Sequence, residues 1–599
     1  MDLPSRLLTL AEDLVELPRF LEVKRALDAA ARDGMKTMGA VCREQAERIP
    51  DRVALRFEDE TVTFGQFNAG VNRFAHVLRR EGVGRGDVVN VMMENSPSML
   101  MAQGACAKLG AVGALVNTHL QGEALAHVHR VSGARVALVD RSGARSLLPL
   151  LDALRGIDFL ADVPEKVADG TRFRLLPEAL DAASDAEPDM PRLGPGDVFL
   201  YVYTSGTTGF PKPAIVRHAK FTAGGRSLSV LLGETEDDCA YAPTPLYHGY
   251  ANFVGFSPAF HRGACFASRR RFSASEFLAD ARRHGVTIFC YVGELCRYLM
   301  RTPPSPADRD HRIRLATGPG LRPDVWEAFR DRFGIPTIID SYGQTEGNVS
   351  LQNRRGRVGS CGRCAPFQHD GLRLARRDAA TGEFVRGPDG FLVECAVGEA
   401  GELLSRISKD SPMAFDGYAN PADNEAKLLR DAFAKGDLWL RTGDLLRRDR
   451  ASYYYFVDRI GDTFRWKGEN VATMEIEHLL NGAPGVHETA VYGVSVPGAD
   501  GRAGMALVVP AEGAGFDPVS FHAHAARTLP AYARPLFVRV AAAVDVTGNF
   551  KNRKSRLQDE GFDPARTGDA LWFRDDETGR YVPLDESLHA GIVAGAKRL

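Results

Sequence analysis

Residues 203–212 read Tyr203-Thr204-Ser205-Gly206-Thr207-Thr208-Gly209-Phe210-Pro211-Lys212 and directly follow an apolar, β-rich run, Val198 to Val202. Glycine lets the backbone come close to a ligand, and the N–H groups of such a turn point at an anion. Four Ser/Thr hydroxyls supply further donors, and Lys212 supplies a point charge. The pattern predicts a phosphate-binding loop, with a flexible surface loop as the alternative. It is not a Walker loop, because no Gly-Lys-Ser/Thr triplet closes it.

Four other polar clusters follow along the chain. They are Asp340-Ser341-Tyr342-Gly343-Gln344-Thr345-Glu346; Arg441-Thr442-Gly443-Asp444; Asp458-Arg459-Ile460-Gly461-Asp462, which leads into Trp466-Lys467-Gly468-Glu469-Asn470; and Thr547-Gly548-Asn549-Phe550-Lys551. Each cluster on its own is weak evidence for a function. In this order and over this span, the clusters resemble the adenylate-forming superfamily of acyl-CoA synthetases, firefly luciferase and peptide-synthetase adenylation domains. The resemblance covers nearly the whole chain.

Other stretches are similar to one branch of that superfamily, the fatty-acid transport proteins and very-long-chain acyl-CoA synthetases. They are Tyr291 to Leu299, Lys467 to Asn470, Phe550 to Pro564 and the ending Tyr581 to Leu584. One departure is Gly318-Pro319-Gly320-Leu321-Arg322, where the family usually has Gly-Asn-Gly-Leu-Arg. Proline removes a backbone N–H and fixes φ, so the departure bears on how this loop contacts adenine.

The resemblance implies a two-step reaction. A fatty acid would attack the α-phosphate of ATP to give acyl-AMP and pyrophosphate, and coenzyme A would then displace AMP. ATP, Mg²⁺ and coenzyme A are therefore the expected cofactors and co-substrates. The rival readings are a bile-acid or steroid-acid CoA ligase, a fatty acyl-AMP ligase that loads a carrier protein, and a non-enzymatic fatty-acid carrier. The Trp466–Asn470 loop argues against the second, and Glu346, Asp444 and Lys551 together argue against the third.

The resemblance also assigns the phosphate contacts. The Thr204–Gly209 loop and Lys212 would hold the β- and γ-phosphates. Glu346 would bind Mg²⁺ together with Thr204, and Thr345 would contact the α-phosphate. A carboxylate that merely starts a helix is the plainer alternative for Glu346.

The adenosine contacts follow in the same way. Tyr342 would stack on adenine, with Gly343 and Gly318 in the same binding region. Asp444 would accept hydrogen bonds from the two ribose hydroxyls, as an ionised carboxylate can. Arg459 would reinforce the ribose and phosphate contacts.

Lys551 would bridge the incoming carboxylate and the α-phosphate, where negative charge crowds together in the transition state. Lys554 is a rival within the same segment, and a solvated surface lysine is the alternative for either. Lys551 must leave before a thiol can enter, which the family achieves by rotating its C-terminal domain about a hinge. The hinge position is Gly461 here, and glycine suits a large backbone change. After rotation, Trp466, Lys467, Gly468 and Glu469 would line the tunnel for coenzyme A.

The resemblance places the acyl pocket after Pro245 and near Tyr291. His248 would gate the acyl tunnel, with a satisfied structural histidine as the alternative. The apolar walls that a fatty chain requires would come from aromatic and aliphatic side chains, for which plain core packing is the alternative. These are Tyr250, Phe253, Val254, Phe256 and Tyr291.

Composition supports a globular protein of more than one domain. The chain has 599 residues, of which 44% are hydrophobic and 25% charged, and its net charge is −2. Nucleic acid is not expected as a partner, because neither a basic excess nor a basic stripe is present. The nine scattered cysteines indicate reduced cytosolic thiols, and the Cys361–Cys364 pair lacks a second pair at zinc-finger spacing.

No apolar run approaches the roughly 18 residues that a membrane-spanning helix needs, and the start of the chain has no signal-peptide layout. Leucines between Leu7 and Leu17 predict an amphipathic helix that ends before Pro18, and a second segment runs from Phe20 to about Ala31. We expect a cytoplasmic protein, with reversible peripheral association at the inner face of the cell membrane as an option. Oligomeric state is left open, with a homodimer among the options.

The alternation of apolar runs with helical patterns predicts a mixed α/β fold whose parallel sheets are covered by helices. Predicted strands are Val88–Val91, Arg135–Val139, Val198–Tyr203, Thr287–Cys290 and Thr337–Ile339, and predicted helices are Asn68–Arg80, Ser98–Lys108 and Ser275–Arg283. From about Phe456 the pattern becomes a shorter α+β unit, with strands near Thr489–Val494 and Gly504–Val509 and helices near Met474–Leu480 and Phe521–Thr528. We therefore expect a large N-terminal domain, residues 1–459, and a small mobile C-terminal domain, residues 460–599.

Overall fold

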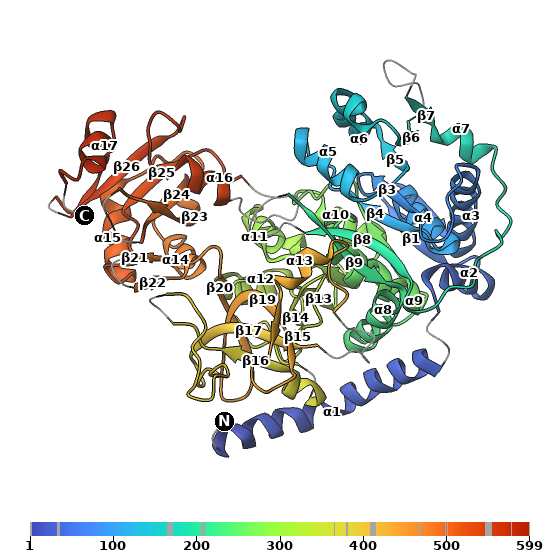
Figure 1. The fold of residues 1–599 in the computed structure, drawn as a ribbon, viewed down its shortest axis with the longest axis horizontal. Coiled ribbons are helices and arrows are strands. Elements are labelled where there is room, and N and C mark those ends of the chain that lie inside the picture. The colour runs from blue at the N-terminus through green and yellow to red at the C-terminus, as the bar shows by residue number, and fades with distance from the viewer. Residues whose placement is uncertain are drawn as a thin grey trace.

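A computed structural model describes most of the chain. The described residues are 3–32, 36–163, 172–204, 210–364, 366–378, 381–407, 415–466, 469–497, 499, 501–545, 554–576 and 578–597. Figure 1 shows a large N-terminal part built on three sheets and a smaller C-terminal part, coloured orange to red, at one side of it. The fold is mixed α/β, as predicted.

The first sheet has seven strands in the order β7-β6-β5-β3-β4-β8-β9. All neighbours are parallel except β9, which pairs with β8 in the antiparallel sense. Its strands are β3 (Val88–Met92), β4 (Val112–Leu115), β5 (Val136–Asp140), β6 (Asp158–Asp162), β7 (Phe173–Leu175), β8 (Val198–Thr204) and β9 (Lys212–Arg217). Polar residues at the carboxyl end of β8 therefore lie at the edge where ligands of such sheets bind.

The second sheet has eight strands in the order β15-β14-β13-β12-β10-β11-β1-β2. Its interior pairs are parallel, and the two edge strands β15 and β2 are antiparallel to their neighbours. Its strands are β1 (Val53–Phe57), β2 (Glu60–Thr63), β10 (Cys239–Tyr241), β11 (Cys265–Ser268), β12 (Ile288–Cys290), β13 (Leu315–Gly318), β14 (Thr337–Gly343) and β15 (Ser350–Asn353).

Helices cover these two sheets, as the alternating pattern predicted. The helices predicted from residues 68, 98 and 275 are present as α3, α4 and α10. The N-terminal helices other than α1 are α2 (Met38–Arg48), α3 (Phe64–Arg80), α4 (Pro97–Leu109), α5 (Gly122–Val131), α6 (Arg141–Leu147), α7 (Leu176–Asp181), α8 (His218–Leu232), α9 (Ser257–Arg262), α10 (Phe277–His284), α11 (Gly293–Arg301), α12 (Pro323–Phe333) and α13 (Pro421–Glu425).

A third, antiparallel sheet follows, which the sequence pattern did not predict. It runs in the order β16-β17-β19-β18, and β20 also pairs with β19. Its strands are β16 (Leu372–Ala375), β17 (Ala400–Arg406), β18 (Leu428–Arg430), β19 (Leu438–Arg448) and β20 (Tyr454–Arg459). The expectation of parallel sheets is therefore incomplete for this region.

The C-terminal part has its own apolar core, which includes Phe464, Trp466 and Ile592. A five-stranded sheet in the order β23-β24-β25-β26-β27 carries that core, and β21 and β22 form a separate hairpin. The elements are β21 (Phe464–Trp466), β22 (Glu469–Val471), α14 (Thr473–Leu480), β23 (Val486–Ser495), β24 (Arg502–Pro510), α15 (Pro518–Thr528), β25 (Phe537–Val540), α16 (Lys554–Glu560), β26 (Ala570–Asp575), β27 (Arg580–Pro583) and α17 (Glu586–Val593). The position of the predicted boundary near Arg459 remains a prediction.

The chain begins with one long helix, α1 (Leu3–Arg32), which lies along the outer edge of the N-terminal part in Figure 1. The predicted break at Pro18 is wrong, because α1 continues through that residue. Buried Phe20 and the ion pair from Asp13 to Arg363 hold it to the body. Seven apolar side chains of α1 stay exposed: Leu7, Leu8, Leu10, Leu14, Val15, Leu17 and Leu21. Within the described residues, no helix has the length and apolar character needed to cross a bilayer.

Candidate active site

The predicted phosphate loop joins β8 to β9. Thr204, the last residue of β8, pairs with Lys212, the first residue of β9, so the two ends of the loop lie opposite each other. Lys212 Nζ lies 2.8 Å from Asp423 Oδ1. The loop residues Ser205, Gly206, Thr207, Thr208 and Gly209 lie outside the described residues, and their phosphate contacts remain predictions.

Glu346 follows the end of β14 and lies next to this hairpin. The Tyr418 hydroxyl donates a hydrogen bond to Glu346 Oε1 at 3.0 Å, and Lys427 Nζ lies 3.8 Å from the same oxygen. The backbone of Tyr418 pairs with Ala214 of β9, and the Ile215 N–H donates to the Gly417 carbonyl at 2.8 Å. Burial, then the Glu346 charge, raise the pKa of Tyr418, so it stays a donor at neutral pH. Glu346 and the phosphate-loop hairpin, far apart in the sequence, therefore share Tyr418 as a neighbour.

Asp444 on β19 accepts hydrogen bonds from residues of the Glu346 segment. Tyr342 donates its hydroxyl hydrogen to Asp444 Oδ2 at 2.6 Å, and Gln344 Nε2 donates to the same oxygen at 3.0 Å. Arg459 is paired with Asp444 across β19 and β20, and its Nε lies 3.7 Å from Asp444 Oδ1. Asp444 and Glu346 thus belong to one site, because Gln344 bridges to Asp444 two residues before Glu346.

The Gly318–Leu321 turn is hydrogen-bonded to the buried carboxylate of Asp340. Asp340 accepts hydrogen bonds from the Leu321 N–H at 2.7 Å and from the Tyr291 hydroxyl at 3.1 Å. Burial raises the pKa of Asp340 to about 7. A side chain at Gly318 would collide with the Tyr291 carbonyl at 2.2 Å, so only glycine fits there. Pro319 donates nothing, but its carbonyl accepts the Gly293 N–H at 3.0 Å.

The predicted acyl segment passes Thr345 at Gly249. A Cβ at Gly249 would stand 3.1 Å from Thr345 Oγ1 and 3.1 Å from the Phe253 ring. Residues Ala251–Phe256 form a short π-helix, a rare element that often marks functional sites. Tyr250 donates its hydroxyl hydrogen to the Thr317 carbonyl at 2.8 Å. His248 is half-buried at the start of this segment, and its role as a gate of the acyl tunnel remains a prediction.

Tyr291 is buried with no exposed surface, as Phe256 nearly is at 2% exposure. It packs in the core of the second sheet, where its ring contacts Phe289. Its role as a pocket wall remains a prediction, and its observed partners are Asp340 and the Gly318 turn.

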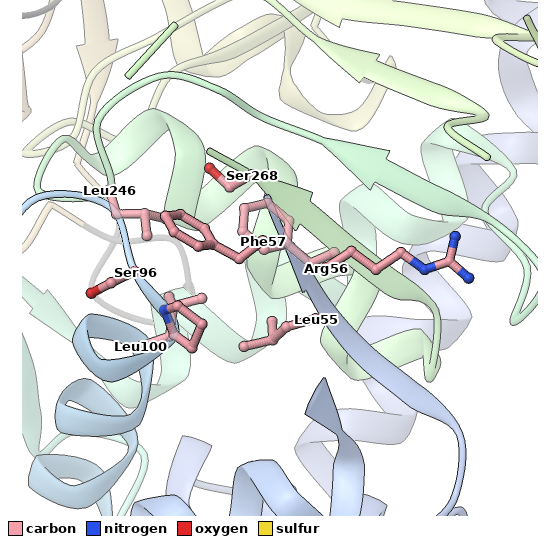
Figure 2. A pocket seen from close by; sticks show the side chains of 9 residues that line it. Leu55, Arg56, Phe57, Ser96, Leu100, Leu246 and Ser268 are labelled. Atoms are coloured by element: carbon pink, nitrogen blue, oxygen red, sulfur yellow. The ribbon is translucent and has the colours of Figure 1, made fainter. Parts of the chain in front are cut away.

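Figure 2 shows a cavity between β1 and the start of α4, with Leu55, Leu100 and Leu246 among its lining residues. The Arg56 side chain extends away from the other labelled residues in this view. The cavity has a volume of about 10 Å³, room for roughly one water molecule. It is far smaller than the roughly 300 Å³ or more of a typical ligand pocket and is not the acyl site.

The C-terminal residues are only partly described. Lys551, Lys467 and Gly468 lie outside the described residues, as does the Glu469 side chain. Trp466 is 3% exposed within the C-terminal core, so its contact with coenzyme A remains a prediction.

Lys554 is buried and engaged within the C-terminal part. Its Nζ lies 2.9 Å from Glu477 Oε1 and donates to Thr473 Oγ1 at 2.6 Å. Lys554, the rival candidate, is therefore an internal anchor at the start of α16, and the role of Lys551 remains a prediction.

Three residues of the site were not assigned by sequence reasoning: Tyr418, Lys427 and, within a quoted cluster, Gln344. Their contacts with Glu346 and Asp444 arise only on folding. A Gly-Tyr pair at 417–418 between polar residues carries no pattern that would have identified the donor.

The oxygen donors at Thr204 and Glu346 suit Mg²⁺. Hard oxygen ligands are what this ion prefers, and it commonly takes one or two protein groups plus substrate phosphates and water. Among the described residues, no group of three or more His, Cys, Asp or Glu side chains is placed to hold a metal. The Thr204 hydroxyl is buried and has no hydrogen-bond partner among the described residues, so it and Glu346 would suit an ion that is shared with a phosphate ligand.

Comparison with known proteins agrees with this geometry. Residues 42–418 match the family model of AMP-binding enzymes, and residues 475–551 match the C-terminal domain of AMP-binding enzymes. The chain belongs to the AMP-binding enzyme family.

Within it, the chain is 39% identical to the mouse long-chain fatty acid transport protein 1, over 98% of this chain and 92% of that protein. It is 38% identical to the medium/long-chain-fatty-acid–CoA ligase FadD6 of Mycobacterium tuberculosis, over 91% and 89%.

Solved structures share the fold. A crystal structure of the anthranilate CoA ligase AuaEII with anthranoyl-AMP matches with a TM-score of 0.74 at 22% identity, covering 88% of this chain and 97% of that one. The Mycobacterium tuberculosis fatty acyl CoA synthetase matches with a TM-score of 0.61 at 26% identity, covering 88% and 99%.

Proposed function

We propose that this protein is a long- or very-long-chain fatty acyl-CoA synthetase that converts a fatty acid, ATP and coenzyme A into acyl-CoA, AMP and pyrophosphate. One observation carries the proposal: Asp444 and Glu346 are linked through Gln344, and Glu346 is linked to the phosphate-loop hairpin through Tyr418, whose side chain binds Glu346 and whose backbone pairs with β9. Ribose, α-phosphate and terminal phosphates of one nucleotide can therefore be held at once. Relatives named for long-chain fatty acids support the choice of acid.

In the first step, a fatty-acid carboxylate oxygen forms a bond to the α-phosphorus, and the bond to the pyrophosphate oxygen breaks. Positioning and charge neutralisation dominate such phosphoryl chemistry. Thr345 contacts the α-phosphate, and Lys551 neutralises the charge where the carboxylate meets it. Tyr342 lies against adenine, and Asp444 holds the ribose hydroxyls.

Glu346 and Thr204 hold Mg²⁺ when it is bound with ATP, and the ion neutralises phosphate charge. Tyr418 and Lys427 restrain the Glu346 carboxylate from the opposite side. The carboxylate thus meets the nucleotide already oriented.

In the second step, the thiol of coenzyme A forms a bond to the acyl carbon, and AMP leaves. We place the hinge at Gly461, between an N-terminal domain of residues 1–459 and a C-terminal domain of residues 460–599. Rotation there removes Lys551 and brings the Trp466–Glu469 hairpin toward the acyl-adenylate. The acyl chain runs past His248, Tyr250 and Phe253.

We further place the protein in the cytoplasm, with reversible peripheral association at the inner face of the cell membrane. The exposed apolar side chains of α1 support that association.

The test is incubation of purified protein with ATP, Mg²⁺, coenzyme A and a panel of acids, followed by mass spectrometry of the products. Palmitate and longer acids should give acyl-CoA and AMP. Product from a steroid acid but not from palmitate would overturn the substrate class. Free acyl-adenylate with no acyl-CoA would make the protein an acyl-AMP ligase instead.

A further inference from the structure

Lys220 contacts the backbone of the Glu346 turn. It sits in the first turn of α8, three residues after β9, and is 4% exposed. Its Nζ donates hydrogen bonds to the Thr345 carbonyl at 2.8 Å and to the Gly347 carbonyl at 2.7 Å. The carbonyl groups of the two residues that flank Glu346 are therefore held by one side chain.

A charged lysine at this position lowers the stability of the fold, because its ammonium group is buried. Burial lowers the pKa of Lys220, whereas the charges of Asp416 and Glu346 act in the opposite direction. A cation in the first turn of a helix is also opposed by the positive end of the helix dipole. An apolar side chain of similar length would avoid both penalties, so the lysine is explained by what its ammonium group holds.

The bonds of Lys220 join two segments that must act on one ligand. The phosphate-loop hairpin leads through β9 directly into α8, and Asp416 pairs with Arg217 at the junction, at 2.8 Å. The Glu346 turn comes from the other sheet, 125 residues further along the chain. Lys220 ties the turn to α8, which continues directly from the hairpin.

We propose that Lys220 is a positioning residue, which fixes the Thr345–Gly347 turn to α8 and so sets the Glu346 carboxylate and Thr345 hydroxyl against the phosphate-loop hairpin. The inference rests on the proposed function, because it assumes that this turn receives Mg²⁺-bound ATP. A displacement of about 1 Å at such a site can cost on the order of 100-fold.

Three variants test it: Lys220→Met, which removes the donors; Lys220→Arg, which retains a cationic donor; and Lys108→Met as a matched control. Lys108 is fully buried, binds Asn68 and Glu187, and lies in α4 away from the turn. Hydrogen exchange of ligand-free protein reports on the 345–348 backbone. Calorimetric titration without fatty acid then gives the affinity for ATP at saturating Mg²⁺ and, separately, for AMP without metal.

In Lys220→Met we expect faster exchange at residues 345–348 and Mg·ATP binding that is weaker by roughly 10- to 100-fold. AMP contacts the turn only through its α-phosphate at Thr345 and otherwise uses the Asp444 side of the site, so it should lose clearly less affinity than Mg·ATP, and Lys220→Arg should recover most of the loss. Lys108→Met should lower the melting temperature without a larger loss of affinity for Mg·ATP than for AMP. A general loss of packing would weaken both nucleotides together.

Unchanged exchange and unchanged Mg·ATP affinity in folded Lys220→Met would overturn the proposal, as would equal weakening of AMP and Mg·ATP. If Lys220→Met does not fold, Lys220→Gln decides by the same two measurements. Wild-type acyl-CoA formation is measured in parallel. If the wild type forms no acyl-CoA but Lys220→Met loses more affinity for Mg·ATP than for AMP, the substrate proposal is wrong and the role of Lys220 stands. If the wild type forms acyl-CoA but Lys220→Met shows no such difference between the two nucleotides, only the role of Lys220 is lost.

Discussion

The Tyr418 hydroxyl lies 3.0 Å from Glu346 Oε1 and donates a hydrogen bond to it, across 72 residues of sequence. Tyr418 comes from the segment that precedes α13, and Glu346 comes from the turn after β14. The bond leaves the second carboxylate oxygen of Glu346 for a ligand, while Lys427 at 3.8 Å adds a positive charge on the side of Tyr418. The carboxylate is therefore oriented before a nucleotide binds.

Tyr418→Phe removes this bond and leaves the ring in place. A hydrogen bond to a charged group is worth about 1.5–3 kcal/mol, so we expect the KM for Mg·ATP to rise at least about tenfold. Initial rates of pyrophosphate release at varied ATP and Mg²⁺ measure this. An unchanged KM and kcat would show that Glu346 does not depend on Tyr418.

Asp444→Asn replaces an acceptor of two hydrogen bonds by a neutral amide. We expect AMP binding to weaken by about 10-fold or more, because the ribose hydroxyls lose a charged acceptor and Tyr342 loses its partner. Calorimetric titration with AMP provides the measurement. Glu394→Gln, which breaks an ion pair with Arg448 at the last residue of β19, is the matched control and should bind AMP like the wild type.

Much of the fold could be predicted from the sequence, because strands buried on both faces read as continuous apolar runs. Val88–Met92 and Val198–Thr204 are of this kind. The antiparallel sheet was missed because β19 mixes apolar residues with Arg441, Asp444 and two terminal arginines. The apolar pattern of β19 is interrupted by these polar residues, one of which, Asp444, belongs to the candidate site.

The helix α1 shows a different limit. Pro18 lacks an N–H and normally ends or kinks a helix. Here α1 continues, because tertiary contacts on both sides of Pro18, from Asp13 and from Phe20, hold it in place. Such contacts cannot be read from local sequence.

Some residues of the candidate site could also be predicted from the sequence, and others could not. Thr204, Glu346 and Asp444 stand in glycine- and hydroxyl-rich clusters, which can be found in a sequence. Tyr418 and Lys220 act through contacts 72 and 125 residues away, so no local pattern marks them. Lys551 stays a prediction.

The two lysines of the C-terminal segment should behave differently. Lys551→Ala should abolish pyrophosphate release but leave thioester formation from supplied acyl-AMP largely intact, because only the first step needs the charge. Lys554→Met should instead lower the stability of the C-terminal part by about 3–5 kcal/mol, since it leaves Glu477 buried without its ion pair. Separate assays of the two half-reactions and thermal unfolding measure these effects. Loss of the first step alone in Lys554→Met would exchange the two roles.

Asp340 predicts a pH dependence of stability. Burial raises its pKa to about 7, above the value of about 3.9 in an unfolded chain. As the pH rises from about 4 to 7, the unfolded chain releases this proton first, so the contribution of Asp340 to stability falls across that window and is constant above it.

Asp340→Asn removes that titration while keeping an acceptor for the Leu321 N–H. We therefore expect its melting temperature to fall less between about pH 4 and 7 than that of the wild type. Differential scanning fluorimetry over this range measures the two slopes. Equal slopes would contradict the assignment of the titration to Asp340.

The account depends above all on the activation of a fatty acid by joining it to AMP, and isotope exchange between pyrophosphate and ATP tests this step most directly. With labelled pyrophosphate, Mg²⁺, ATP and palmitate but no coenzyme A, we predict label in ATP that depends on palmitate and is lost in Lys551→Ala. No exchange with palmitate or any longer fatty acid, or release of ADP and phosphate in place of AMP and pyrophosphate, would contradict the account.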